Sequence, residues 1–126
     1  MRTRVPPALY SADLSGCTDL VDRAADEIMA TFGTALRRAG ATVVHEISHA
    51  FPETGLTCVL ILSESHAVLH TWPETGTVNI DIFSCSTRLR SLEAIDELRR
   101  SFGARHVTVQ EIARADGHGR QSDGRG

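Results

Sequence analysis

Apolar residues recur along the chain with two different periods, which distinguish strands from helices. Alternation of apolar and polar residues, or a short continuous apolar run, is typical of a strand, whereas apolar residues three and four positions apart are typical of a helix. By this criterion we predict strands at residues 8–14, 42–48, 56–62, 66–72, 77–83 and 105–112. Short turns join several successive strands, and this favours antiparallel pairing.

Helical spacing occurs in two segments. In the first, apolar residues from Leu20 to Leu36 recur at helical intervals, with Thr18 as the expected N-cap and Gly40 as the stop. The second segment covers residues 90–102, and Gly103 ends it. The order strand, helix, several strands, helix, strand predicts an α+β fold, a two-layer sandwich of one antiparallel sheet with two helices packed on one face.

The length of 126 residues allows one hydrophobic core, so we predict a single domain over residues 1–114. Residues 115–126 consist mainly of Gly, Asp, Arg, Ser and Gln and are expected to be a disordered tail. A chain this short, with 41% hydrophobic residues, gains stability by burying surface against a second copy, which makes a homodimer plausible.

Charge and cysteine content narrow the function classes. A net charge of −3 without a basic stripe argues against binding to nucleic acid or to an anionic membrane. No apolar run reaches the roughly 20 residues that span a bilayer, and the start of the chain lacks the apolar segment of a secretory signal. Cys17, Cys58 and Cys85 are widely spaced and odd in number, so we expect a cytoplasmic protein with free thiols.

The segment His45-Glu46-Ile47-Ser48-His49 matches the zinc protease pattern H-E-x-x-H. That pattern requires a helix, on which the two histidines lie one turn apart and face one metal ion. Here it follows Gly40 and a β-branched triplet, which predict a strand, and a strand would separate the histidines by roughly 13 Å. A zinc hydrolase is therefore a remote alternative, and we predict no metal.

Polar and reactive residues are concentrated between Leu62 and Cys85, where they interrupt an otherwise apolar sheet. Such local conflict is expected at functional sites. The block offers serine hydroxyls, imidazoles and a thiol, which by themselves indicate no more than acyl chemistry. Each residue also has a purely structural explanation: His70 as a hydrogen-bonded sheet histidine, Cys85 as a small buried apolar residue and Ser65 as a turn residue.

The spacing within this block closely resembles that of the bacterial and archaeal S-adenosylmethionine decarboxylase proenzymes, which process themselves and carry a pyruvoyl group. The resemblance rests on three motifs at the family's separations: Ser63-Glu64-Ser65-His66, His70-Thr71-Trp72-Pro73-Glu74 and Asp81-Ile82-Phe83-Ser84-Cys85. A match of this length is far more specific than the five-letter zinc pattern.

The resemblance implies that Ser65 attacks the carbonyl of Glu64, that the resulting ester undergoes β-elimination, and that Ser65 becomes a pyruvoyl group. The products would be a β chain of residues 1–64 and an α chain of residues 65–126. Three further roles follow by resemblance: His70 as the base in processing, Thr57 as its assisting hydroxyl, and Cys85 as the proton donor in decarboxylation. Phe51 and Glu74 would bind the adenine and the ribose of the substrate.

Decarboxylation of an amino acid requires an electron sink, and a covalent pyruvoyl group supplies one by forming a Schiff base with the substrate amine. The chain contains no lysine that could hold pyridoxal phosphate. The resemblance thus implies a lyase that converts S-adenosylmethionine to decarboxylated S-adenosylmethionine and CO2 for spermidine biosynthesis, assembled as a homodimer of αβ units with sites near the subunit interface.

Three departures from the family pattern weaken the prediction of the substrate more than the prediction of self-processing. Ser86 replaces a small glycine-containing stretch, Thr75 and Thr77 replace aromatic residues, and Pro6-Pro7 stands near the usual glycine-and-histidine opening. The alternatives are therefore the same chemistry on arginine or ornithine, or a non-catalytic homologue that binds a substrate or partner.

Overall fold

The computed structural model describes residues 4–117 and contains six strands and two helices in that range. In chain order the elements are β1 (Arg4–Ser15), α1 (Ala25–Arg38), β2 (Val43–Phe51), β3 (Gly55–Leu62), β4 (Ser65–Trp72), β5 (Thr77–Ser86), α2 (Ser91–Ser101) and β6 (His106–Ala113). Each predicted strand and helix is therefore present, and the strands mostly extend a few residues beyond the predicted limits. Most of the predicted tail, from residue 118 onward, lies outside the described residues.

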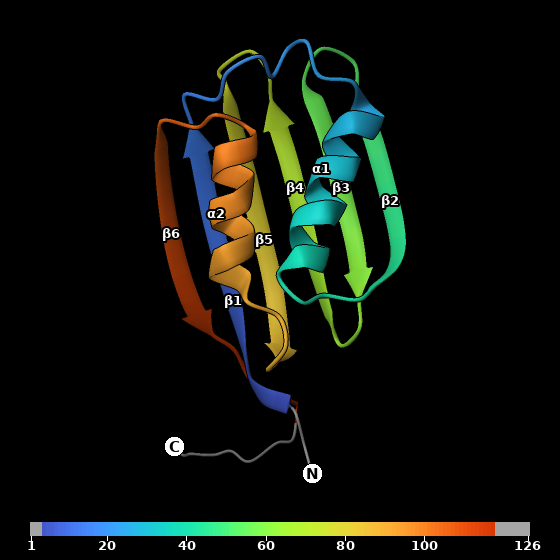
Figure 1. Ribbon diagram of the computed structural model, residues 1–126, viewed down its shortest axis with the longest axis vertical. Helices are drawn as coiled ribbons and strands as arrows, with labels where there is room; N and C mark the ends of the chain where they lie inside the picture. The colour runs from blue at the N-terminus through green and yellow to red at the C-terminus, as the bar shows by residue number, and fades with distance from the viewer. Residues whose placement is uncertain (1–3, 118–126) are drawn as a thin grey trace.

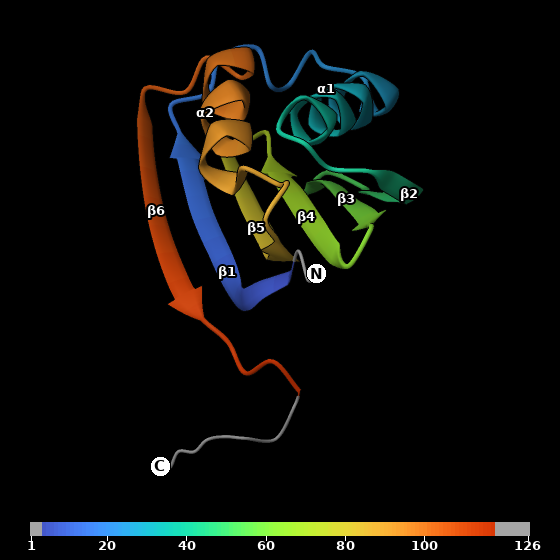
Figure 2. The ribbon, with the colours of Figure 1, turned by 60° about the horizontal axis from the view of Figure 1, so that its bottom comes forward.

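The strands form one sheet in the order β2-β3-β4-β5-β1-β6, with antiparallel neighbours throughout (Figure 1). Both helices lie on the same side of this sheet (Figure 2). The predicted α+β two-layer sandwich is confirmed. Because β1 is inserted between β5 and β6, the two ends of the described chain meet beside the end of β5.

The start of α1 differs from the prediction. The helix begins at Ala25, and Thr18 is not its N-cap, because Asp19 has a positive φ of 58° that no α-helix accommodates. The N-terminal turn is closed instead by the Glu27 carboxylate, which accepts a hydrogen bond from the Ala24 backbone N–H at 3.2 Å. Leu20 is buried nonetheless, and packs from the preceding loop.

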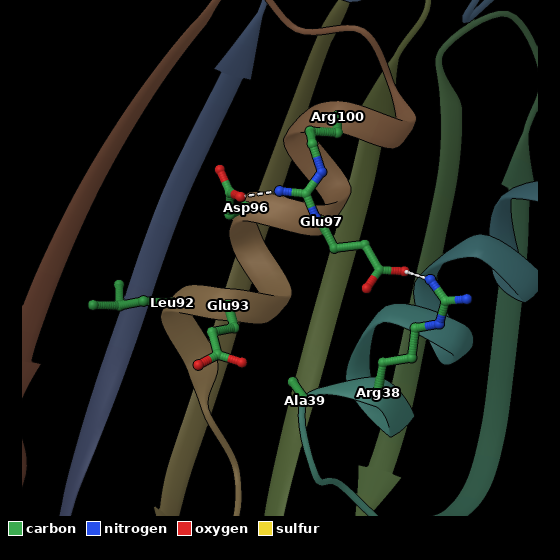
Figure 3. Close-up of a pocket in the computed structure, with 7 residues that line it drawn as sticks. All are labelled: Arg38, Ala39, Leu92, Glu93, Asp96, Glu97 and Arg100. Carbon is green, nitrogen blue, oxygen red and sulfur yellow. Dashed lines mark hydrogen bonds and ion pairs between the residues drawn. The ribbon is translucent and has the colours of Figure 1, made fainter.

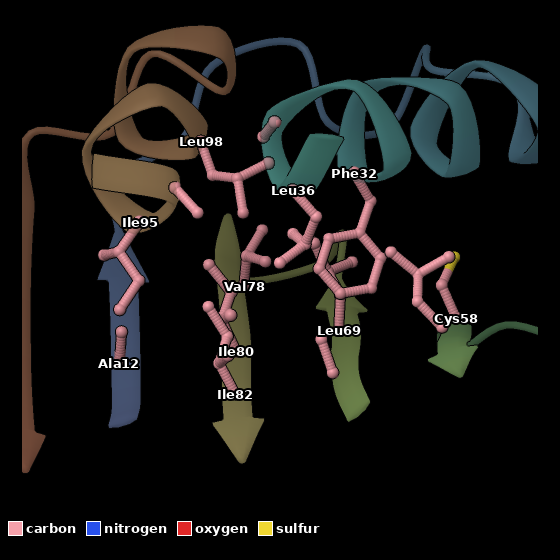
Figure 4. Close-up of a cluster of buried hydrophobic side chains, with 14 of the residues drawn as sticks. Ala12, Phe32, Leu36, Cys58, Leu69, Val78, Ile80, Ile82, Ile95 and Leu98 are labelled. Atoms are coloured by element: carbon pink, nitrogen blue, oxygen red, sulfur yellow. The ribbon is translucent and has the colours of Figure 1, made fainter. Parts of the chain in front are cut away.

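The core lies between the helices and one face of the sheet (Figure 4). Phe32 and Leu36 project from α1, and Ile95 and Leu98 from α2, onto the apolar residues of β3, β4 and β5. Alternate residues of each strand point away from this core because side chains in a strand alternate between faces. The register therefore assigns each residue of the central strands to one face.

The face that the helices do not cover is called the open face. One row across it joins Thr57, His70, Asn79 and Asp13, and the next rows follow at two-residue steps. Large apolar side chains remain 38–48% exposed on this face, namely Ile47, Phe51, Ile61, Trp72 and Ile112. An apolar surface of this kind usually marks an interface.

Cys58 lies in the core beneath α1, and its thiol is expected to make the fold less stable at alkaline pH. Burial, followed by the negative charge of Glu46, raises the pKa of Cys58 from 9.0 to about 11. The unfolded chain therefore loses this proton at a lower pH than the folded chain. The contribution is complete below about pH 9 and disappears as the pH rises toward 11, a loss of about 2 kcal/mol in the free energy of unfolding.

Urea denaturation at a series of pH values measures this loss, with the Cys58→Ala variant as the comparison. The variant should show a flatter decline between about pH 9 and 11. No lysine titrates in this range, although burial also raises the pKa of Cys17 and of Tyr10. An equally steep decline in both proteins would contradict the assignment to Cys58.

Candidate active site

Ser65 is the first residue of β4 and follows a two-residue hairpin that connects β3 to β4. The second residue of this hairpin, Glu64, has a φ of 63°, in the left-handed region that costs a non-glycine residue about 1 kcal/mol. Ser65 is only 8% exposed, and its Oγ finds no hydrogen-bond partner among the described residues. A buried hydroxyl without a partner, next to a strained peptide bond, fits a nucleophile better than a structural role.

Cys85 contacts the same peptide bond from β5. Its thiol donates a hydrogen bond to the backbone carbonyl oxygen of Glu64, with Sγ and O 2.9 Å apart. The register explains the contact: His66 pairs with Phe83, so the same register continued by two residues places Glu64 opposite Cys85. The thiol thus polarises the carbonyl that Ser65 would attack. Glu64, Ser65 and Cys85 are called the cleavage cluster.

A cavity of about 240 Å³ opens beside the cleavage cluster. Glu64 and Cys85 line it together with residues from distant parts of the chain, namely Pro7, Phe83, Ala115 and Asp116. The Arg114 backbone N–H donates to the Pro7 carbonyl at 3.0 Å, which ties the two ends of the described chain together here. Phe83 belongs to the motif that ends at Cys85, whereas Pro7, Ala115 and Asp116 were not predicted, since only the strand order places them at this point.

Thr57 and His70 form a second group, at the other end of the central strands. They pair across β3 and β4, and Thr57 Oγ1 lies 2.6 Å from His70 Nδ1. The Phe51 ring lies 5.9 Å from the His70 ring, and the Trp72 ring lies 4.5 Å from it. His70 Nε2 is buried without a partner among the described residues. These four residues are called the histidine cluster.

Within one chain the two clusters are far apart. Ser65 and His70 are five residues apart on β4, a distance of roughly 16 Å at about 3.3 Å per residue. Because five is an odd number, their side chains also point to opposite faces of the sheet. Ser65 faces the helices and His70 the open face. The structure therefore brings Cys85 to the Glu64 carbonyl next to Ser65, but it does not bring His70 to Ser65.

Glu74 lies in the exposed turn between β4 and β5, at the same end of the sheet as the histidine cluster. Phe51, at the end of β2, is also at this end, where its ring stacks edge-on with His49 at 4.6 Å. The two residues that the resemblance assigns to substrate binding thus lie at the same end of the sheet as His70, and not at the end that carries Ser65.

The zinc interpretation of His45, Glu46 and His49 is wrong. The segment is part of β2, so the two histidines lie on one face and Glu46 on the other. Glu46 pairs instead with Arg37 of α1 at 3.0 Å. Over residues 4–117, no group of three or more His, Cys, Asp or Glu side chains is arranged to hold a metal ion.

A larger hollow, of about 410 Å³, lies on the outer surface of the two helices (Figure 3). Its charged side chains mostly neutralise one another: Arg38 pairs with Glu97 at 3.3 Å, and Asp96 pairs with Arg100. The pKa of the Asp96 carboxyl is lowered, first by its hydrogen bond with Arg99 and then by the charge of Arg100. Since the hollow contains no nucleophile and is separated from both clusters by the helices, its size does not make it the active site.

A model of the S-adenosylmethionine decarboxylase family matches residues 8–115. The chain is 32% identical over 103 residues to the S-adenosylmethionine decarboxylase proenzyme of Pelotomaculum thermopropionicum, covering 82% of each chain. It is 35% identical over 105 residues to the proenzyme of the same name from Acidithiobacillus ferrooxidans, covering 83% of this chain and 75% of the relative.

The fold is similar to that of a solved structure, the adenosylmethionine decarboxylase from Aquifex aeolicus VF5. The TM-score is 0.78 at 22% identity, and the match covers 95% of this chain and 99% of the other. In the part of the chain that the structure describes, neither helix is long and apolar enough to cross a membrane.

Proposed function

The chain belongs to the S-adenosylmethionine decarboxylase family, and from this premise we propose that it decarboxylates S-adenosylmethionine with a pyruvoyl group made from its own Ser65. The product would be the aminopropyl donor for spermidine-type polyamines. The observation that carries the proposal is the contact of the Cys85 thiol with the Glu64 carbonyl oxygen, beside the buried and unpartnered Ser65 hydroxyl.

Self-cleavage requires an activated carbonyl and a nearby hydroxyl. The Ser65 Oγ attacks the Glu64 carbonyl carbon, and the hydrogen bond from Cys85 stabilises the negative charge that develops on the carbonyl oxygen. Collapse of the tetrahedral intermediate transfers the acyl group from the Ser65 nitrogen to the Ser65 oxygen. Breaking this peptide bond also relieves the strain of the left-handed Glu64 backbone. Removal of the Ser65 α-proton then expels the Glu64 carboxylate, which separates residues 1–64 from residues 65–126 and leaves dehydroalanine at position 65. Water hydrolyses this group to the pyruvoyl group, and the former Ser65 nitrogen leaves as ammonia.

Cys85 has a second task once the chain is cut. A pyruvoyl group at position 65 supplies the carbonyl through which the electrons of the broken carbon–carboxylate bond are delocalised. The protein must then return a proton to the substrate carbon. Cys85 lines the cavity together with Glu64, the residue before Ser65, and a thiol can donate a proton near neutral pH.

A homodimer would supply the histidine that one chain cannot bring to Ser65. The cleavage and histidine clusters lie at opposite ends of β4, about 16 Å apart. If two copies pack open face to open face about a two-fold axis, the hairpin end of one sheet, where Cys85 contacts the Glu64 carbonyl on that face, meets the end of the other sheet that carries His70. Ser65 follows Glu64 directly, although its own side chain points to the helix side. The exposed apolar residues of the open face, Ile47, Ile61 and Ile112 among them, would be buried by this packing.

The substrate is tested by measuring release of labelled CO2 from carboxyl-labelled S-adenosylmethionine, arginine and ornithine. We expect release from S-adenosylmethionine alone, with the Ser65→Ala protein as the blank. Release from arginine or ornithine would reassign the substrate while keeping the chemistry. If the cut protein releases CO2 from none of the three, the chain is not a decarboxylase of this class.

Replacement of Cys85 should separate its two tasks. Cys85→Ala removes the donor to the Glu64 carbonyl and the proton donor, so we expect self-cleavage to slow about tenfold, a modest loss because a thiol is a weak donor. Decarboxylation by the cut protein should fall at least a hundredfold. The extent of cleavage is followed by intact mass and the turnover by CO2 release. A Cys85→Ala protein with full turnover would exclude the thiol as proton donor.

A further inference from the structure

Trp72, the only tryptophan in the chain, is held by two consecutive hydrogen bonds on the open face. Its indole Nε1–H donates to Asn79 Oδ1 at 2.6 Å, and Asn79 Nδ2 donates to Asp13 Oδ1 at 2.8 Å. The three residues come from β4, β5 and β1, and Asn79 pairs with Asp13 across the strands. Asp13, Asn79 and Trp72 are called the indole relay.

The donor and acceptor types give the relay a single direction. An indole nitrogen can only donate, and a carboxylate can only accept. The Asn79 amide must therefore turn its oxygen to Trp72 and its NH2 group to Asp13. The Asp13 carboxylate fixes the amide, and the amide in turn fixes the plane of the indole ring.

The ring that the relay fixes is in contact with His70. The Trp72 and His70 rings meet edge to face, with centroids 4.5 Å apart and planes at 60°. Thr57 Oγ1 lies 2.6 Å from Nδ1 of the same imidazole, and the Phe51 ring centroid lies 5.9 Å from that of the imidazole. His70 Nε2 is left without a partner among the described residues, as expected of a group that transfers protons.

We propose that Asn79 and Asp13 are positioning residues for processing: they hold the Trp72 indole so that His70 presents Nε2 in one orientation. The inference rests on the proposed function, in which His70 is the processing base. Neither residue touches the reacting atoms, so their effect passes through Trp72. Proton transfer is sensitive to errors of about 1 Å in the position of a catalytic group, and loss of the relay should slow the cut accordingly.

The principal variant is Asn79→Leu, which keeps the size of the side chain and removes both hydrogen bonds. We expect the half-time of self-cleavage, followed by intact mass, to lengthen about tenfold. We also expect the fluorescence anisotropy of Trp72 to fall in the uncut protein, because the indole gains freedom. The matched control is Ser11→Ala, which removes another hydrogen bond between β1 and β5, from Ser11 to Asp81 at 2.7 Å, two residues away from the relay.

A swap of the two relay residues provides the rescue test. Asn79→Asp alone places two carboxylates against each other, so cleavage should slow as in Asn79→Leu. In the double variant Asp13→Asn with Asn79→Asp, a carboxylate at position 79 still accepts from Trp72, and an amide at position 13 donates to it. Cleavage should return to within about twofold of the wild-type rate, and the anisotropy should recover with it.

Wild-type cleavage and anisotropy in Asn79→Leu would overturn the proposal, as would a double variant no faster than Asn79→Asp. A slowing of the same size in Ser11→Ala would overturn it too, because the effect would then belong to the sheet and not to the relay. If the wild-type chain never cuts itself, the proposed function fails first. The anisotropy of uncut Asn79→Leu and of the swap would then still show whether the relay holds Trp72.

Discussion

Replacing Ser65 with alanine is expected to leave one intact chain of 13.7 kDa and to abolish decarboxylation. The hydroxyl is the nucleophile of the cut and leaves with Glu64 in the elimination, which converts the carbon atoms of Ser65 into the pyruvoyl group, so no other residue can substitute for Ser65. The structure supports this role through the burial of Ser65 and the absence of a described partner for its Oγ. The alanine variant should fold normally, because it removes a hydroxyl that makes no hydrogen bond with the described residues.

Intact-mass analysis under denaturing conditions measures the effect. The wild-type protein should give fragments that meet between Glu64 and Ser65, the second with a pyruvoyl start. Ser63→Ala is the matched control, since Ser63 lies in the same hairpin but is exposed, and this variant should still be cut. Cutting of Ser65→Ala at the same bond, or loss of cutting in Ser63→Ala alone, would assign the nucleophile to a different group.

The sequence predicted the layers of the fold because the two apolar periods differ so clearly. Strict alternation in β4 and β5 also predicted that His70 and Trp72 share a face, and the register confirms it. The start of α1 was not predictable from spacing, because Leu20 is buried at a helical interval without belonging to the helix. A buried loop residue and a helical residue give the same pattern.

The motifs named the candidate site residues, but they did not predict that these residues form two separate clusters. The pairing of β4 with β5 brings Cys85 to Glu64, as a single site requires. The residues Pro7 and Asp116 were missed because only the insertion of β1 between β5 and β6 carries them to the cavity. Likewise, the contact of Asn79 with Asp13 depends on the register between two strands that are distant in the sequence.

The separation of Ser65 from His70 leads to the second large expected effect. If each site combines Ser65 of one chain with His70 of another, two inactive variants should complement each other. Homodimers of His70→Ala should cut themselves at least a hundredfold more slowly than wild type, because a positioned base contributes about that much. Homodimers of Ser65→Ala cannot cut at all. A mixed dimer of the two, however, contains one site with an intact Ser65 and an intact His70.

Only one chain of the mixed dimer should be cut, and the identity of that chain shows whether His70 acts on Ser65 of the partner. The intact site uses Ser65 of the His70→Ala chain and His70 of the Ser65→Ala chain, so the His70→Ala chain is the one that breaks. After co-expression in equal amounts with random pairing, about half of the His70→Ala chains lie in mixed dimers and should be cut. The two chains are distinguished by intact mass, because their substitutions change the mass differently.

A second mixture provides the control: His70→Ala with the double variant Ser65→Ala and His70→Ala. No site in this mixture has an intact His70, so cutting should stay at the level of the His70→Ala homodimer. Equal cutting in both mixtures would show that the partner contributes no histidine. Rapid cutting of the His70→Ala homodimer would show that the base is another group. Because an imidazole cannot span the roughly 16 Å along β4 within one chain, we expect rapid cutting only in the mixture that contains an intact His70.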